Sequence, residues 1–284
     1  MLRNFHLNRA QIEDDLLIMH QNGQRRLRIG LFHGRGLSSG TLIDSTGGTI
    51  DQQYLTNLAD LLATVRAIGY EEIQFAFFPP GQNNPGTWGT SYSWGSTEES
   101  YLLENWGLVT QVMPVLRSSG LLFRVDLGNE LYIARFAPRT LALSNQSNYA
   151  KKMWEKFRST YTIGESVGFS VRASEIPKLS TARLIYGNYP PYLMSIHVYN
   201  NTDSTIRSAH SALNSANYQY TGLVIGETPY NDLTSAQQIQ SASLNIGSRP
   251  IHYVLQWPLT ATPTCADVDV APPVDFSNYI LYGF

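Results

Sequence analysis

Short apolar segments alternate with amphipathic helical segments along almost the whole chain, and this alternation constrains the fold more than any other feature. Segments at 27–32, 72–78, 121–127, 167–171, 194–199, 223–227 and 251–257 have the pattern of strands. Apolar residues recur at helical spacing between them, and capping-box patterns that begin at Thr49 and Thr234 mark two helix starts. Strands that alternate with helices form βαβ units, so the sequence predicts an α/β fold with a parallel sheet.

The length of the chain matches a single barrel of such units. The 284 residues contain no linker or low-complexity tract, and single α/β barrels commonly have about 250 residues. We therefore predict one (β/α)8 TIM-barrel domain over residues 1–284. A closed barrel needs an eighth strand, which must precede the helix around residues 11–20. Two alternatives stay open: Leu2–His6 is that strand, or it lies upstream of Met1, so the first strand is weak or missing.

Composition and charge exclude several classes of function. The net charge of −2 and the scattered basic residues give no footprint for nucleic acid. No window approaches 18 consecutive apolar residues, so we expect no membrane-spanning helix. Cys265 is the single cysteine, and the six histidines lack metal-ligand spacing, so we expect neither a metal nor a cofactor. The low charged fraction of 15% and the aromatic fraction of 12% suit a neutral, hydroxylated ligand better than a charged one.

Compartment and assembly are less constrained. The first residues lack the apolar core of a signal peptide. We expect a cytoplasmic protein, or a secreted or periplasmic one if a leader has been removed, and both alternatives stay open. We expect a monomer.

Two glutamates end two different predicted strands. Functional residues of α/β barrels lie where the strands reach their C-terminal face. Glu130 follows one strand and Glu227 ends another, and each comes after an apolar run. A pair of carboxyl groups across a pocket is what glycosidic cleavage requires, because one donates a proton while the other attacks or activates water.

The sequence around these glutamates resembles a known group of enzymes. Asp-Leu-Gly-Asn-Glu at 126–130 and Val-Ile-Gly-Glu at 224–227 resemble the two glutamate-bearing strand ends of glycoside hydrolase clan A, a group of retaining (β/α)8-barrel glycosidases. Ile-His-Val-Tyr at 196–199 and Leu-Gln-Trp at 255–257 are similar to two further strand ends of the clan. The family within the clan is not determined by these motifs.

The resemblance implies roles for the residues that match. Glu130 corresponds to the general acid/base and Glu227 to the nucleophile. Asn129 is expected to bind the sugar 2-hydroxyl next to the bond that breaks. Tyr199 is expected to orient Glu227 and keep it ionised.

Other residues of the expected site come from neighbouring strand ends. His197 is expected beside the acid/base or the sugar, and Trp257 is expected to stack on the sugar ring. The clan also has an arginine near its nucleophile. Arg28 and Arg35 both fit that position in the sequence, and Arg35 is included among the predicted substrate-binding residues.

Aromatic residues in the loops extend the predicted binding surface. Trp88 and Trp94 belong to a long loop that follows a strand and is rich in Asn, Gly and Ser. Their rings, with that of Tyr230 beyond Glu227, can stack on sugars outside the cleavage point. The alternative is that these rings anchor long loops.

Together, these features predict a glycoside hydrolase that cleaves β-glycosidic bonds in an oligo- or polysaccharide by double displacement. The alternative is a catalytically inactive barrel that binds carbohydrate, in which the two carboxylates do not converge. A Schiff-base lyase needs a buried lysine at a strand end. All four lysines fall on predicted helices or loops, which disfavours that class.

Overall fold

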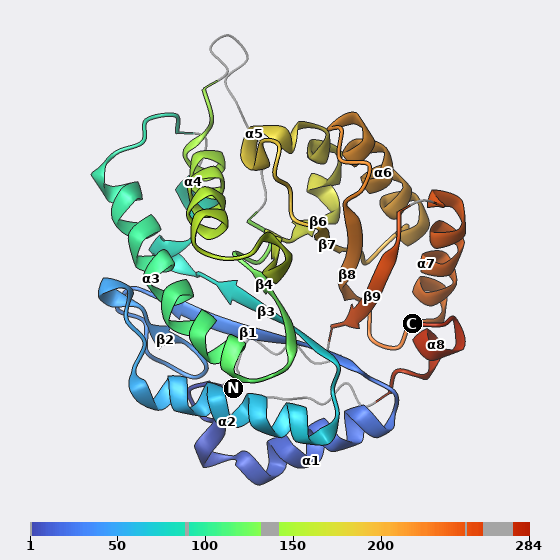
Figure 1. Ribbon diagram of the computed structural model, residues 1–284, viewed down its shortest axis with the longest axis horizontal. Coiled ribbons are helices and arrows are strands. Elements are labelled where there is room, and N and C mark those ends of the chain that lie inside the picture. The colour runs from blue at the N-terminus through green and yellow to red at the C-terminus, as the bar shows by residue number, and fades with distance from the viewer. Residues whose placement is uncertain (1, 89–90, 132–141, 248, 258–274) are drawn as a thin grey trace.

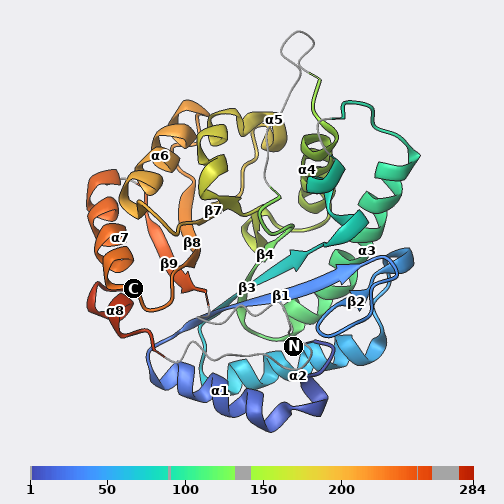
Figure 2. The same cartoon turned by 180° about the vertical axis from the view of Figure 1, so that it is seen from behind.

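The computed structural model describes residues 2–88, 91–131, 142–247, 249–257 and 275–284. In this part of the chain every strand pair is parallel, and the helices surround the strands in chain order (Figures 1 and 2). The strands are β1 Arg26–Gly34, β2 Ile43–Asp44, β3 Glu72–Phe78, β4 Leu122–Asp126, β5 Ser166–Gly168, β6 Val171–Arg172, β7 Leu193–His197, β8 Gly222–Thr228 and β9 Ile251–Gln256. The helices are α1 Arg9–Gln21, α2 Gln52–Ile68, α3 Ser96–Ser118, α4 Asn145–Thr160, α5 Arg183–Tyr186, α6 Thr202–Ser215, α7 Leu233–Ile246 and α8 Ser277–Leu281.

The strands form two sheets around one interior. Their orders are β2-β1-β3-β4-β5 and β6-β7-β8-β9. The short strands β5 and β6 are separated only by Phe169 and Ser170, after Gly168 with a φ of 71°. They are two halves of one interrupted barrel strand. Strand β9 also lies beside β1, and β5 beside β7, so the two sheets together make a barrel without a continuous hydrogen-bonded ring in the described residues.

The seven predicted strands are confirmed, but the candidate eighth strand at the N-terminus is not. Residues Phe5–Leu7 form a 3-10 helix, so of the two alternatives left open, the one that places a strand at Leu2–His6 is wrong. Leu2 and Phe5 are buried in the core. The side-chain amide of Asn57 donates a hydrogen bond to the carbonyl of Leu2 at 2.5 Å. The peptide groups of this segment are therefore bonded to a turn and a side chain instead of a sheet.

Helix α2 starts after its predicted cap, and helix α7 starts before its predicted cap. Asp51 caps α2 by accepting a hydrogen bond from the backbone N–H of Gln53, and Asp232 caps α7 by accepting from Ser235. The sequence patterns had indicated Thr49 and Thr234. A carboxylate is favoured at this position because it also faces the positive end of the helix dipole.

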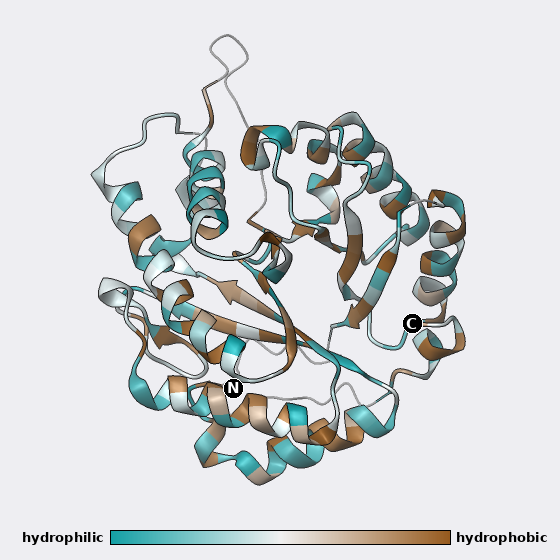
Figure 3. Cartoon of the chain, viewed as in Figure 1, coloured by the Kyte–Doolittle hydropathy of each residue, from teal (hydrophilic) through white to brown (hydrophobic). Residues whose placement is uncertain are grey.

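The apolar core lies mainly between the strands and the surrounding helices. Each helix carries both hydrophobic and hydrophilic residues, whereas the strands contain stretches of hydrophobic residues, which are brown in Figure 3. A smaller apolar cluster lies across β5, β7, β8 and β9 and consists of Val167, Leu193, Val224, Tyr253 and Leu255. Among the described residues, no helix combines the length and the apolar character needed to cross a bilayer.

Candidate active site

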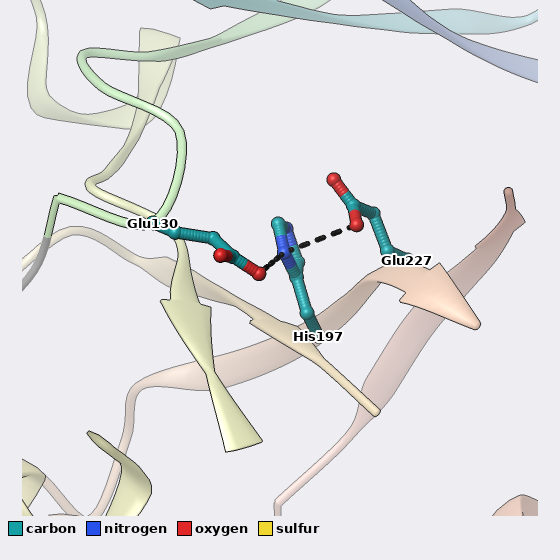
Figure 4. Close-up of side chains that lie close together, drawn as sticks. All are labelled: Glu130, His197 and Glu227. Atoms are coloured by element: carbon teal, nitrogen blue, oxygen red, sulfur yellow. Dashed lines mark hydrogen bonds and ion pairs between the residues drawn. The ribbon is translucent and has the colours of Figure 1, made fainter. Parts of the chain in front are cut away.

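Three side chains from separate strand ends meet at the carboxyl end of the barrel. Glu130 follows β4, His197 ends β7 and Glu227 lies near the end of β8, with the two glutamates on either side of the imidazole (Figure 4). The His197 Nδ1 atom lies 2.9 Å from Glu130 Oε1 and 3.4 Å from Glu227 Oε2. One oxygen of each carboxylate and one nitrogen of the imidazole all lie within 4.8 Å of one another. The two predicted carboxylates therefore converge.

A bulge in β8 turns Glu227 toward the interior. Ile225 pairs with Ile196 and Glu227 with His197, so Gly226 is an extra residue in this strand. Such bulges redirect side chains next to active sites. Gly226 has no room for a side chain, because a Cβ atom there would overlap the Ser195 hydroxyl and touch the His197 ring.

A tight turn presents Glu130. Its φ of 53° is left-handed, which is uncommon for a residue with a side chain and costs on the order of 1–2 kcal/mol. The Glu130 backbone N–H donates to Ser170 Oγ at 2.8 Å, and the Asn129 backbone N–H donates to the Phe77 carbonyl at 2.8 Å. Strand β3 and the interrupted strand β5–β6 therefore hold this strained turn from both sides.

Arg28 of β1 connects the two halves of the site. Its guanidinium donates to Glu227 Oε1 at 2.6 Å, Asp126 Oδ2 at 3.0 Å and Asn129 Oδ1 at 2.7 Å. The Arg28 side chain is 9% exposed, and Asp126 is fully buried. Charge-assisted bonds of this kind are strong in a water-poor environment. Because one cation faces two carboxylates, a net negative charge remains in the network.

Tyr199 supplies the second donor to Glu227. Its hydroxyl donates to Glu227 Oε2 at 2.5 Å. Burial and the charge of Glu227 raise the pKa of the Tyr199 hydroxyl far above its ordinary value, so it stays protonated and remains a donor. Arg28 thus binds one oxygen of Glu227 and Tyr199 binds the other.

The environment of Glu130 differs from that of Glu227. The hydrogen bond from His197 lowers the pKa of the Glu130 carboxyl below its ordinary value, against the opposing effect of burial. The charges of Arg172 and Arg28 add to this lowering. In the ligand-free state Glu130 is therefore favoured in its ionised form.

The same cluster could hold a metal ion by spacing alone. Glu130, His197 and Glu227 offer three ligand atoms at suitable separations. Both oxygens of Glu227, however, already accept strong hydrogen bonds from Arg28 and Tyr199. A divalent cation would also face the guanidinium of Arg28. The donor set therefore suits a carboxylate that reacts with a neutral ligand better than one that binds a metal.

Of the two arginines that fit the position beside Glu227 in the sequence, Arg28 occupies it and Arg35 does not. Its guanidinium pairs with Glu104 of α3 and lies over the ring of Tyr101, 4.4 Å from the ring centroid. Its backbone N–H donates to Asn83 Oδ1 at 2.7 Å. Arg35 lies just beyond the end of β1 and contacts the loop at 81–88, whereas the Arg28 side chain contacts Glu227 and Asp126 in the interior.

Trp88 and Trp94 anchor the long loop after β3. Trp88 packs against Trp94, Tyr101 and Tyr149, with ring centroids 5.7–6.2 Å apart. The indole N–H of Trp94 donates to Glu99 at 2.8 Å, and Lys152 lies over its ring. These contacts match the loop-anchoring alternative rather than a sugar platform.

The two remaining predicted aromatic residues lie near the same end of the barrel. Trp257 follows β9 and is half-buried, and its backbone N–H donates to the Thr228 carbonyl at 2.8 Å. The hydroxyl of Tyr230 accepts a hydrogen bond from the backbone N–H of Asp275 at 3.1 Å. Stacking of either ring on a sugar stays a prediction.

Two residues that position the site were not among the predicted site residues. Asp126 accepts bonds from Arg28 and from the backbone N–H groups of Gly128 and Ser170. Its place on the same strand face as Arg124 was a usable sequence signal. Ser170 had none, because its role depends on the break between β5 and β6.

Solved structures provide an independent comparison. No family model matches the sequence, and the search of curated proteins gave no match. An endo-1,4-β-mannanase from Rhizomucor miehei is similar with a TM-score of 0.56 and 12% identity, over 96% of this chain and 90% of the other. A glycoside hydrolase family 5 enzyme from Prevotella bryantii, in complex with a xyloglucan tetradecasaccharide, has a TM-score of 0.57 and 12% identity, over 95% and 86%. A GH5_18 protein from Bifidobacterium longum has a TM-score of 0.53 and 13% identity, over 90% and 68%.

This chain has the fold of the TIM-barrel glycosidases. The likeness extends over nearly the whole chain, which confirms the predicted fold class. In an inactive barrel we expected the two carboxylates to lie apart. In the structure they lie close together. The lysines lie in α4 and in the 3-10 helix Ala173–Thr181, away from the strand ends that a Schiff-base enzyme would use.

Proposed function

We propose that this protein is a retaining glycoside hydrolase that cleaves β-linked oligo- or polysaccharides, with Glu227 as nucleophile and Glu130 as general acid/base. The observation that carries this proposal is the spacing of the carboxylates, whose facing oxygens lie within 4.8 Å. Retaining enzymes hold their two carboxyl groups about 5–5.5 Å apart, whereas inverting enzymes need about 6.5–9.5 Å to admit a water molecule.

In the first step, a carboxylate oxygen of Glu227 forms a bond to the anomeric carbon as the glycosidic C–O bond breaks. The proton of Glu130 moves to the departing oxygen. Arg28 and Tyr199 each donate a hydrogen bond to the attacking carboxylate and orient it. The oxygen of Asn129 is engaged by Arg28, so its amide N–H group is available to a sugar hydroxyl.

In the second step, Glu130 acts as the base. It removes a proton from a water molecule, whose oxygen attacks the anomeric carbon and releases Glu227. Two successive displacements retain the anomeric configuration. Glu130 must be protonated in the first step, so the bound sugar has to offset the low pKa of this carboxyl in the free enzyme. Exclusion of water by the sugar acts in that direction.

The nature of the substrate follows from composition and from the structural likeness. The chain is poor in charged residues and rich in aromatic ones, which suits neutral saccharides. The similar structures include a mannanase and an enzyme that holds a xyloglucan fragment, and these support a β-linked polysaccharide as the substrate class.

The direct test is an activity screen with matched variants. Aryl β-glycosides and a panel of mannans, glucans and xyloglucan are incubated with the wild type, Glu130→Gln, Glu227→Gln and Glu165→Gln. Glu165 pairs with Arg117 on the outside of the barrel, so its variant is the control. We expect hydrolysis by the wild type and the control, and a loss of about 10³-fold or more in the two site variants.

Two results would contradict the proposal. Undiminished hydrolysis by Glu227→Gln would show that Glu227 is not the nucleophile. If NMR shows that the first product has inverted anomeric configuration, double displacement is excluded.

A further inference from the structure

Two phenylalanines line the interior face of the barrel at its carboxyl end. Phe32 of β1 and Phe78 of β3 are register partners, and their rings stack with centroids 4.4 Å apart and an interplanar angle of 23°. Phe32 is 36% exposed, and Phe78 is half-buried. An apolar side chain on the inner face of a strand is usually covered, so an exposed stacked pair in this position is unusual.

The chain leaves room for this pair. Gly30 lies two residues before Phe32 on the same face of β1, and a Cβ atom there would press against both rings. The two rings therefore lean over Gly30. Leu37, also about one third exposed, packs over Gly34 at the end of the same strand and extends the apolar surface.

The pair is adjacent to the reacting groups. The guanidinium of Arg28 lies 5.1 Å from the centroid of the Phe78 ring while it binds Glu227 and Asn129. The backbone of Asn129 is also bonded to the carbonyl of Phe77, next to Phe78. A sugar attacked by Glu227 would thus have the phenylalanine rings as a neighbour on the side of Arg28.

We propose that Phe32 and Phe78 form a stacking platform for a second sugar ring, on the non-reducing side of the sugar attacked by Glu227. The proposal rests on the proposed function and adds that the substrate is a chain with at least one such further unit. Neither ring carries a hydrogen-bonding group, so recognition is through the C–H face of a pyranose. The leaving group belongs on the other side, with Glu130, which protonates it.

Binding is measured separately from hydrolysis. Cellotetraose and mannotetraose are titrated calorimetrically into the Glu227→Gln protein, alone and combined with Phe32→Ala, Phe32→Leu, Phe32→Tyr or Tyr220→Ala. Tyr220 is 99% exposed and provides the control. We expect at least one tetrasaccharide to bind about tenfold more weakly after loss of the ring in the Ala and Leu variants, and to bind normally in the Tyr and control variants.

Kinetics with an active nucleophile give the second readout. Phe32→Ala is compared with the wild type on aryl β-monoglycosides and on the matching aryl β-diglycosides. We expect KM for the diglycoside to rise about tenfold and that for the monoglycoside to change little. An equal effect on both substrates would place the rings against the leaving group and overturn the proposal.

The failure of the platform and that of the proposed function are distinguishable. If the wild type hydrolyses its substrate but the Phe32→Ala and Phe32→Leu variants bind the tetrasaccharides normally, only the platform is overturned. Ring-dependent binding by a protein that hydrolyses nothing would overturn the hydrolase function and leave the platform in place. Absence of binding by every tetrasaccharide tested would overturn the platform.

Discussion

At the scale of single residues, the site is organised around the charge on Glu227. Its two oxygens accept from two different donors, the guanidinium of Arg28 and the hydroxyl of Tyr199. Asp126 balances the arginine from the opposite side. This arrangement gives each oxygen of a nearly buried carboxylate its own hydrogen-bond donor, which fixes the orientation that a nucleophile at an anomeric centre needs.

Replacement of Arg28 tests this organisation. Arg28→Lys keeps the charge but cannot reach three acceptors at once, so we expect kcat/KM to fall about 10²–10³-fold. Arg35→Lys changes a pair that lies outside the site and should stay within about twofold of the wild type. Steady-state kinetics measures kcat/KM of the two variants, and circular dichroism checks that both are folded. Equal losses in both variants would mean that the assignment of Arg28 is wrong.

The pH dependence of kcat/KM follows from the low pKa of Glu130. Glu130 must carry a proton to act as an acid, and kcat/KM reports the pKa of this group in the free enzyme, so kcat/KM falls as the pH rises through that pKa. Because the pKa is held below its ordinary value, we expect an optimum on the acidic side of neutrality. His197→Ala removes the main cause, so the pKa should rise and the alkaline limb should move to higher pH.

The control for this profile is His252→Ala, because His252 is exposed at the start of β9. Its profile should match that of the wild type. An alkaline limb that stays in place in His197→Ala would show that His197 does not set the protonation of Glu130.

Most of the central residues could be predicted from the sequence, because they occupy strand ends with recognisable neighbours. Glu130 and Glu227 are examples. The choice between Arg28 and Arg35 could not be made, since both lie on one segment and only the exit direction of the chain separates them. The position of Phe32 was also hidden, because an apolar residue in a strand usually belongs to the core.

At the scale of elements, irregular backbone places the reacting groups. The alternation of a regular strand would direct Gly226 and Glu227 to opposite faces, and the bulge in β8 overrides it. An isolated glycine within a strand, such as Gly226, is a sequence marker of such a bulge, but a weak one. The left-handed turn at Glu130 has no marker of this kind, because it depends on contacts with β3 and Ser170.

Gly226→Ala tests the bulge. The added methyl group would overlap the Ser195 hydroxyl, so we expect a loss of about 1–3 kcal/mol in the free energy of unfolding and reduced kcat. The double variant Ser195→Ala/Gly226→Ala removes the obstacle and should recover part of both. Unfolding in urea provides the measurement. No recovery in the double variant would mean that the overlap is not the cause.

Local sequence patterns predict the presence of a helix but not the residue that caps it. The presence of α2 and α7 followed from apolar spacing, but their caps are Asp51 and Asp232 instead of the predicted threonines. Several polar residues in each segment can serve as caps. Helix ends inferred from such local patterns are therefore uncertain by one or two residues.

At the scale of the whole molecule, the barrel is held together by helices where strand ladders are missing. Helix α1 packs against α2, with the Tyr70 hydroxyl donating to the Leu16 carbonyl at 2.8 Å. Beyond its end, Gly23 faces Ile280 of α8. Helix α1 thus links the first and last parts of the barrel, where β1 and β9 lie side by side.

Adjacent leucines in α1 give a matched pair for this role. Leu16 is 2% exposed and Leu17 is 42% exposed. We expect Leu16→Ala to lower the free energy of unfolding by about 2–5 kcal/mol, and Leu17→Ala by about 0.5 kcal/mol or less. Denaturant titration measures both. Similar values for the two variants would contradict the packing described for α1.

The α/β class and seven strands could be predicted from the sequence, because each segment reports its own periodicity. Closure of the barrel could not be predicted from the sequence. It depends on how β9 meets β1 and on the interruption between β5 and β6, and both arise from packing between distant segments. The single domain and the monomeric state stay predictions.

The central claim is that Glu227 becomes covalently bound to sugar during turnover. The most direct measurement is mass spectrometry of the protein after reaction with slow fluorinated β-glycosides, matched to the saccharides that the activity screen identifies as substrates. The account predicts one added glycosyl group on the peptide that carries Glu227, and none in Glu227→Gln. A glycosyl group on a different residue, or complete turnover of these substrates with inverted configuration and no adduct, would contradict it.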